Sequence, residues 1–149
     1  MRAVLQRVRR AQVSVDGEVT GKIGPGLLAL VAVHRDDQQS DVSWMRRKLI
    51  NLRFFDDAEG KLNLSLSQVG GKILAVSQFT LYGDCRKGNR PSYTRSAGPD
   101  KAQALYDQLV EDLRAGGVPV ETGVFQASMQ VELVNDGPVT LMLDSRQRL

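Results

Sequence analysis

Three side chains in this sequence could act as a nucleophile or base, and none has the partners that such chemistry needs. The 149 residues include one histidine, His34, and one cysteine, Cys85. A Ser-His-Asp or Cys-His arrangement would have to use His34. It lies between an apolar run and residues 35–37 (Arg-Asp-Asp), so we expect it where a strand exits to solvent, in a structural role. Cys85 lies beside Arg86 and Lys87 without a base, and we expect a neutral role.

The third candidate is Thr80, whose hydroxyl would need an adjacent base that the neighbouring sequence does not supply. The alternative is an ordinary strand threonine, which β propensity favours. Asp56, Asp57 and Glu59 could in principle exchange protons, but they precede Gly60 in what reads as a solvated turn. No His/Cys/Asp/Glu spacing resembles a metal site, so we expect no metal and no cofactor. The ordinary machinery of a hydrolase is missing, which is informative if the substrate brings its own catalytic group.

A Gly-Pro step, Gly137-Pro138, interrupts what otherwise reads as one strand over residues 131–143. Proline lacks an N–H and fixes φ, so in mid-sheet it removes a hydrogen bond. The same step occurs at Gly24-Pro25 and Gly98-Pro99, where it indicates a turn and a helix start. Gly137-Pro138 is therefore either another turn or edge, or a backbone segment that presents itself to a ligand. An X–Pro bond adopts cis at small cost, and the sequence leaves the isomer open.

A second unusual segment, Ser77-Gln78-Phe79-Thr80-Leu81, ends an apolar stretch that begins at Lys72. This segment and Asn135-Asp136-Gly137-Pro138-Val139-Thr140 together resemble the two signature motifs of the D-aminoacyl-tRNA deacylase family. The resemblance covers Met1 to about Ser145. Five further segments resemble that family in the same order, namely residues 1–8, 23–28, 60–65, 90–92 and 129–131.

The resemblance implies an enzyme that hydrolyses the ester bond of D-aminoacyl-tRNA, a chiral proofreading reaction, and that also acts on glycyl-tRNA(Ala). Ser77, Gln78, Phe79 and Thr80 would line the pocket for the adenosine and the aminoacyl group, and their backbone N–H groups would make polar contacts. The 2′-hydroxyl of the substrate would help to activate water, while backbone amides hold the developing oxyanion. The family also implies a homodimer.

In that homodimer, Gly137 and Pro138 of one subunit would reach into the partner's site as a screen. A carbonyl fixed near the α-carbon would hold the α-amino group and clash with an L side chain, which excludes L-aminoacyl-tRNA. Because glycine has no side chain, this screen would not reject glycyl-tRNA. Phe125 and Met129 resemble flanking pocket positions of the family. Gln126 and Cys85 depart from the family pattern and bear on fine substrate preference.

The charge of the chain permits an anionic partner without requiring one, because the net charge is +3 and the pI about 9.2. Arg86, Lys87 and Arg90 lie in one polar loop. They could bind tRNA phosphates, with release of counterions, or they could simply be solvated. Two further hypotheses stay open at this stage: a nucleic-acid-binding protein without catalysis, and an esterase or amidase with Thr80 as nucleophile.

Length and composition are those of one soluble domain, 42% hydrophobic and 25% charged. We expect a single domain over residues 1–145 and a short mobile tail over residues 146–149. No apolar run reaches the 18 or so residues that span a bilayer, and we expect no membrane partner. The start of the chain lacks the apolar core of a signal peptide. One cysteine cannot form an internal disulfide, which suits a cytoplasmic location.

The elements that must position these residues are many strands and two helices, an α+β pattern. Asp16-Gly17 predicts a hairpin, and residues 83–98 read as a loop. One helix is expected after an N-cap at Ser40, and another from Pro99 to Gly116. Strands are expected over residues 4–8, 12–15, 27–33, 72–81, 118–122 and 129–143. The family resemblance implies a compact β-barrel-like sheet with these two main helices.

Overall fold

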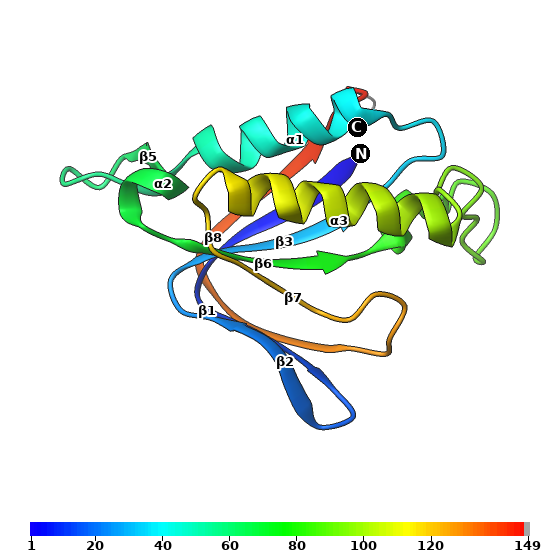
Figure 1. Ribbon diagram of the computed structural model, residues 1–149, viewed down its shortest axis with the longest axis horizontal. Helices are drawn as coiled ribbons and strands as arrows, with labels where there is room; N and C mark the ends of the chain where they lie inside the picture. The colour runs from blue at the N-terminus through cyan, green and yellow to red at the C-terminus, as the bar shows by residue number, and fades with distance from the viewer. Residues whose placement is uncertain (148–149) are drawn as a thin grey trace.

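A curled six-stranded sheet with two helices against its outer face forms most of the molecule (Figure 1). We describe residues 1–147 from a computed structural model. The strands are β1 (Arg2–Val15), β2 (Glu18–Ile23), β3 (Gly26–Ala32), β4 (Arg53–Asp56), β5 (Leu62–Ser65), β6 (Lys72–Ser77), β7 (Val120–Thr122) and β8 (Gln130–Asp144). The helices are α1 (Gln39–Asn51), α2 (Leu66–Val69), the 3₁₀ turn η1 (Phe79–Tyr82) and α3 (Pro99–Ala115).

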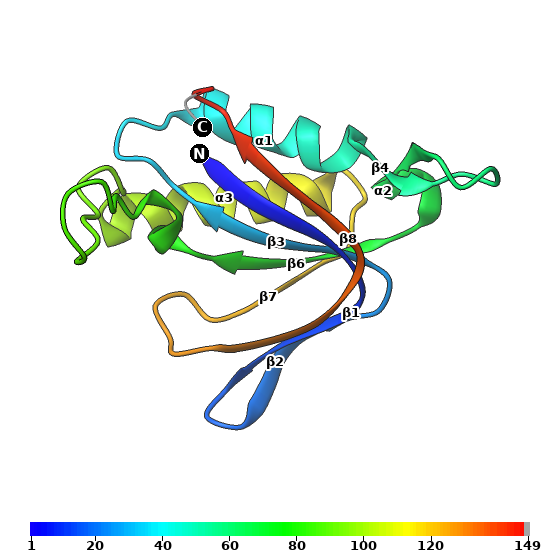
Figure 2. The same cartoon turned by 180° about the vertical axis from the view of Figure 1, so that it is seen from behind.

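The long strand β1 organises the sheet. Its first half, residues 2–8, pairs antiparallel with β3, and its second half, residues 11–15, pairs with β2. On its other edge β8 follows both halves (Figure 2). Parallel pairing then adds β6 to β3 and β7 to β6. The sequence predicted two separate strands where β1 is continuous, because register shifts near residues 8–10 bend the strand without ending it.

The sheet curls until β2 approaches β7, which makes it nearly closed. A Cβ atom at Gly21 of β2 would lie 2.5 Å from the carbonyl oxygen of Thr122 on β7. Only glycine fits this close approach of two backbones. The α+β, barrel-like architecture expected for this chain is therefore confirmed.

Two hydrophobic cores hold the layers together. The larger core lies between the sheet and helices α1 and α3, and includes Met45, Leu49, Leu109 and Leu113 at less than 2% exposure. The smaller core fills the inside of the curl. Its buried members are Val8, Ala11, Val13, Ile23, Leu28, Leu74 and Val76. Met129 and Val131 pack against this second core near the open end of the curl.

The predicted helices are present with one corrected boundary. Helix α3 begins at Pro99 and ends before Gly116, as expected. Helix α1 has Gln38 as its N-cap, not Ser40, because the Asp41 carboxylate accepts the Gln38 N–H at 2.8 Å. The short helix α2 was missed, although Ser65 and Gln68 form a capping box at its start.

The strand predicted over residues 72–81 ends at Ser77, so the prediction is wrong for the last four residues. The Gln78 N–H makes the last bond, to the Val31 carbonyl at 2.7 Å. The chain then turns into η1, where the Leu81 and Gly83 N–H groups bond to the carbonyls of Gln78 and Thr80. The signature segment is thus a tight turn at the end of β6 rather than the tip of a strand.

The end of β8 lies beside the start of the chain and beside α1 (Figure 1): the Ser145 N–H bonds to the Met1 carbonyl at 2.9 Å, and the Ser145 hydroxyl bonds to Asp41 at 2.6 Å. Of the predicted tail, Arg146 is anchored, since its backbone N–H bonds to Asp144 and its guanidinium to the Asp36 carbonyl. Residues 148–149 lie outside the described part of the chain. None of the helices over residues 1–147 is long and apolar enough to cross a membrane.

Candidate active site

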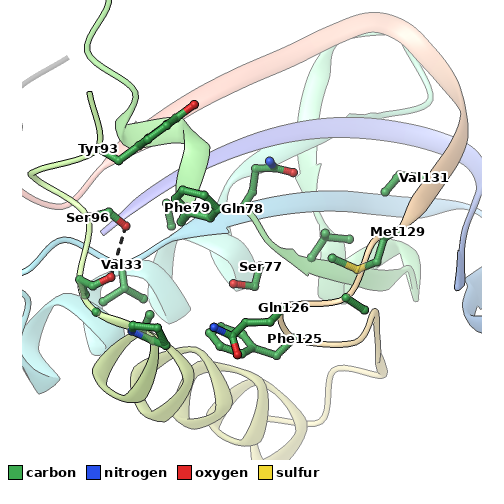
Figure 3. Close-up of a pocket in the computed structure, with 17 residues that line it drawn as sticks. Val33, Ser77, Gln78, Phe79, Tyr93, Ser96, Phe125, Gln126, Met129 and Val131 are labelled. Atoms are coloured by element: carbon green, nitrogen blue, oxygen red, sulfur yellow. Dashed lines mark hydrogen bonds between the residues drawn. The ribbon is translucent and has the colours of Figure 1, made fainter. Parts of the chain in front are cut away.

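A cavity of about 680 Å³ opens where the parallel strands β3 and β6 end side by side (Figure 3). Three further segments complete its walls: the loop before α3, the first turn of α3, and the β7–β8 connection. Its lining residues are Ala32, Val33, Val76, Ser77, Gln78, Phe79, Tyr93, Ser96, Ala97, Gly98, Pro99, Ala102, Phe125, Gln126, Ala127, Met129 and Val131. A mostly apolar pocket with a few polar groups at the carboxyl ends of parallel strands is a typical ligand site.

The signature segment supplies one wall of the cavity. Ser77, Gln78 and Phe79 line it, whereas Thr80 does not. The Thr80 hydroxyl instead accepts a hydrogen bond from the Gln78 side-chain amide. An amide cannot act as a general base, so this contact does not activate Thr80 as a nucleophile.

The backbone of the same turn presents two N–H groups in succession. In η1 the N–H groups of Leu81 and Gly83 are used by carbonyls of the turn, and that of Gln78 by Val31. The first N–H groups of a helical turn have no partner within it, and no backbone carbonyl among residues 1–147 accepts from Phe79 or Thr80. Two neighbouring N–H donors beside a cavity can stabilise a developing oxyanion.

The opposite wall comes from the β7–β8 connection, which contributes Phe125 and Met129 to the cavity lining. Phe125 packs against Tyr106 of α3, with ring centroids 6.5 Å apart. The Tyr106 hydroxyl donates to the Ala75 carbonyl at 2.9 Å, and burial raises the pKa of this tyrosine. Gln126 also lines the cavity and has a positive φ of 64°, which is uncommon for a non-glycine residue.

Sequence reasoning missed the third wall, from Tyr93 to Ala102. These residues belong to a loop and a helix start that share no motif with β6. Two backbone bonds join the loop to the end of β3: Arg35 N–H to Arg95 O and Ala97 N–H to Val33 O, both 2.9 Å. The one signal in the sequence that could have indicated this wall is Tyr93, an aromatic residue within a basic loop.

Gly137 and Pro138 protrude from β8 in an exposed bulge and do not line the cavity. Gln6 of β1 pairs with Thr140 of β8, and Val8 pairs with Asn135. The chain therefore advances two residues along β1 but five along β8, and the extra residues of β8 form the bulge. The Gly137-Pro138 peptide is cis. A Cβ atom at Gly137 would lie 2.2 Å from the Val139 nitrogen, so the bulge requires glycine.

The buried side chain of Arg7 holds this bulge from behind. Its Nε donates to the Asp136 carbonyl at 3.0 Å, and Nη1 donates to the Phe54 carbonyl at 3.3 Å. The carboxylates of Asp136 and Asp56 lie 3.3 Å from the same guanidinium. Asn135 adds two bonds through Nδ2, to the carbonyls of Arg7 and Val139. The protruding segment therefore has a fixed backbone.

The other candidate catalytic side chains do not line the cavity. His34 is 8% exposed, its Nδ1 accepts the Asp36 N–H at 3.1 Å, and burial lowers its pKa. A neutral, hydrogen-bonded histidine fits the structural role expected from the sequence. Asp57 accepts the backbone N–H groups of Lys61 and Glu59 in the β4–β5 turn, and these bonds lower its pKa. Cys85 is exposed.

The basic loop at the cavity mouth has two internal ion pairs, both to Asp84: Arg86 lies 2.5 Å and Arg95 lies 3.9 Å from its Oδ2. Asp84 accepts from Arg86 at both carboxylate oxygens, and these bonds hold the pKa of Asp84 well below its usual range. Arg86 is thus engaged within the protein. Within residues 1–147, Lys87 and Arg90 make no ion pair with an acidic side chain.

Comparison with known proteins assigns the chain to one class of tRNA-directed hydrolases. Residues 4–144 match the family described as D-Tyr-tRNA(Tyr) deacylase. The chain is 58% identical over 147 residues to a D-aminoacyl-tRNA deacylase of Desulfitobacterium hafniense (strain DSM 10664 / DCB-2), covering 99% of both chains. It is 59% identical over 147 residues to one of Anaeromyxobacter dehalogenans (strain 2CP-C), with the same coverage. The chain therefore belongs to the D-Tyr-tRNA(Tyr) deacylase family.

Two solved structures share the fold. The first, titled c-Myc DNA Unwinding Element Binding Protein, has a TM-score of 0.92 and 41% identity, with 97% of this chain and 98% of that chain covered. The second is titled a probable eukaryotic D-amino acid tRNA deacylase, with a TM-score of 0.81 and 21% identity over 95% and 97% of the two chains. At that identity it supports the fold alone.

Proposed function

We propose that this protein hydrolyses the ester bond of D-aminoacyl-tRNA, releasing the D-amino acid and free tRNA, and that it does so in the cytoplasm. The observation that carries this proposal is the cavity at the end of β6, where the segment from Ser77 to Thr80 offers two backbone N–H donors. Membership of the family, with relatives named D-aminoacyl-tRNA deacylase at 58–59% identity, supports the same substrate.

The catalytic proposal uses the backbone and the substrate rather than a protein nucleophile. The N–H groups of Phe79 and Thr80 stabilise the oxyanion that forms when water attacks the ester carbonyl. The 2′-hydroxyl next to the ester helps to activate that water, because no histidine, cysteine or carboxylate lines the cavity in the described residues. A substrate ending in 2′-deoxyadenosine tests this step. Hydrolysis of that substrate at the normal rate would contradict it.

Chiral selection is proposed to come from a second subunit of a homodimer. Gly137 and Pro138 are exposed, rigidly held and absent from the cavity of their own chain. Placed in a partner's cavity, their carbonyls hold the α-amino group and leave no room for an L side chain. Glycyl-tRNA(Ala) has no side chain to exclude, so it is proposed as a second substrate.

Mixed dimers separate a screen in cis from one in trans. One subunit carries Gly137→Ala, and the other carries a substitution in the Ser77–Thr80 turn that abolishes its own activity. A screen in trans gives L-tyrosyl-tRNA hydrolysis only when the active cavity faces the altered loop. In this mixed dimer the active cavity faces the unaltered loop of its partner, so the proposal predicts full chiral selection. If the mixed dimer hydrolyses L-tyrosyl-tRNA, the screen acts within one chain and the cross-subunit proposal fails.

The decisive test of the activity is release of amino acid from D-tyrosyl-tRNA by the purified protein. Hydrolysis above the spontaneous rate supports the deacylase. Binding of tRNA without hydrolysis would favour a nucleic-acid-binding protein, and hydrolysis through a covalent acyl-Thr80 adduct would favour a threonine esterase.

A further inference from the structure

Two aromatic rings stay exposed at the mouth of the cavity. Phe79 of η1 and Tyr93 of the following loop pack edge to face, with ring centroids 5.1 Å apart (Figure 3). Phe79 is 53% exposed and Tyr93 38% exposed. Large apolar side chains gathered in water beside a pocket mark an interaction surface. We call these two rings the aromatic platform.

The backbone under the aromatic platform is fixed. Ser92, next to Tyr93, exchanges two hydrogen bonds with Asp84 at 2.8 and 3.0 Å. The Ser96 N–H bonds to the Tyr93 carbonyl at 3.0 Å. A Cβ atom at Gly83 would lie 3.2 Å from Cε1 of the Tyr93 ring, so the ring rests directly on this glycine. A ring held in this way loses little freedom when a ligand binds.

The net charge around the aromatic platform favours an anionic ligand. Residues 84–96 contain four basic residues and one acidic residue, a net charge of +3. The whole chain has 20 basic and 17 acidic residues, so the remaining 16 and 16 cancel. All of the net positive charge is therefore assigned to this one loop. A concentration of cations beside exposed aromatic rings favours a single-stranded nucleic acid over a second copy of this chain.

We propose that Phe79 and Tyr93 form a stacking site for the unpaired nucleotides that precede the terminal adenosine of tRNA, with Lys87 and Arg90 contacting their phosphates. The proposal rests on the proposed function, which puts the terminal adenosine in the cavity. Every base offers a face for stacking, so the site accepts the shared 3′ end of different tRNAs.

The test compares two substrates that differ only in those nucleotides: D-tyrosyl-tRNA and D-tyrosyl-adenosine. The platform predicts that Tyr93→Ala lowers the tRNA-to-adenosine ratio of kcat/KM about tenfold or more, the range for loss of one base–aromatic stack. Tyr93→Phe keeps the ring and keeps the ratio. A fluorescent cytidine analogue at the nucleotide before the terminal adenosine is quenched by the native protein and by Tyr93→Phe, and not by Tyr93→Ala.

An unchanged ratio in Tyr93→Ala, or a loss that is equal for both substrates, would overturn the platform. So would a change in oligomeric mass with the ratio intact, because the rings would then form a subunit contact. If the native protein hydrolyses neither substrate, the deacylase proposal fails, and the fluorescence still decides the platform. Quenching that depends on the Tyr93 ring supports the stacking site, whereas equal fluorescence in all variants contradicts it.

Discussion

The guanidinium of Arg7 donates from Nε to the main-chain carbonyl of Asp136 at 3.0 Å, immediately before the Gly137-Pro138 step. The two residues are 129 positions apart in the sequence, and β1 and β8 bring them together. A buried cation with four oxygen contacts, two carbonyls and two carboxylates, fixes the orientation of a segment that is itself exposed. The bulge can therefore present its carbonyls to another molecule without collapsing onto its own strand.

Replacing Arg7 with methionine removes the charge and the donors while keeping most of the side-chain volume. We expect the free energy of unfolding to fall by about 2–3 kcal/mol, since one buried and one partly buried carbonyl lose a charged donor. We also expect discrimination between D- and L-tyrosyl-tRNA to weaken, because the bulge loses its anchor. Urea unfolding and paired hydrolysis rates measure the two effects.

Arg9 provides the matched control for Arg7. It lies 3.6 Å from the same Asp136 carboxylate, but its side chain is 76% exposed. Arg9→Met is expected to change stability by less than about 0.5 kcal/mol and to leave discrimination intact. Equal effects of the two substitutions would show that pairing with the Asp136 carboxylate matters, and that the buried hydrogen bonds of Arg7 do not.

Gly137→Ala tests the shape of the bulge. Its new Cβ would meet the Val139 nitrogen at 2.2 Å, a distance that forces the backbone to move. We expect L-tyrosyl-tRNA to be hydrolysed at least about tenfold faster relative to D-tyrosyl-tRNA, since about 1.4 kcal/mol of discrimination corresponds to that factor. Gly24→Ala, at another Gly-Pro step, meets nothing within 4 Å and is expected to keep full selectivity. If Gly137→Ala keeps full selectivity, the Gly137-Pro138 segment does not act as the chiral screen.

Local signals in the sequence predicted much of this fold. Asp16 and Gly17 have φ values of 49° and 80°, as the hairpin signal required. Pro99 and Gly116 bound α3 as predicted. In each case the preference of one or two residues determines the backbone, so nearby sequence is sufficient.

Features that depend on distant backbone could not be predicted in this way. The closure at Gly21 requires the carbonyl of Thr122, and the end of β6 depends on the last bond to Val31. The two signature motifs indicated Ser77 and Gly137, but the third cavity wall was missed. Tyr93 joins the site only because its loop bonds to the end of β3.

Thr80→Val removes the hydroxyl and keeps the branched shape of the side chain. We expect D-tyrosyl-tRNA hydrolysis to continue within about tenfold of the native rate, since only the bond from Gln78 is lost. The proposed oxyanion donors are backbone N–H groups and remain in place. Single-turnover rates measure the effect, and mass spectrometry of the native protein looks for an acyl adduct. A variant without activity, together with an adduct on Thr80, would establish covalent catalysis.

His34 makes a prediction for stability against pH. Burial, followed by the charge of Arg146, lowers its pKa below the ordinary value of 6.5. The unfolded chain therefore binds a proton at a higher pH than the folded protein does. The contribution of His34 to the free energy of unfolding is fully present above pH 6.5 and falls as the pH drops below that value. It stops changing once the pH is below the pKa of His34 in the folded protein.

His34→Gln removes this titration, so its unfolding free energy should depend less on pH than that of the native protein. Urea unfolding between about pH 7.5 and about pH 5 covers the relevant range. Deacylation rates should show no matching change in this range, because His34 does not line the cavity. A loss of activity that follows the protonation of His34 would give this residue a catalytic part.

The most direct measurement is the hydrolysis of D-tyrosyl-, L-tyrosyl- and glycyl-tRNA by the purified protein under one set of conditions. We predict fast release from the D ester, slower release from the glycyl ester and no release from the L ester above the spontaneous rate. Equal hydrolysis of the D and L esters would contradict the Gly137-Pro138 screen, and no hydrolysis of any ester would contradict the deacylase itself.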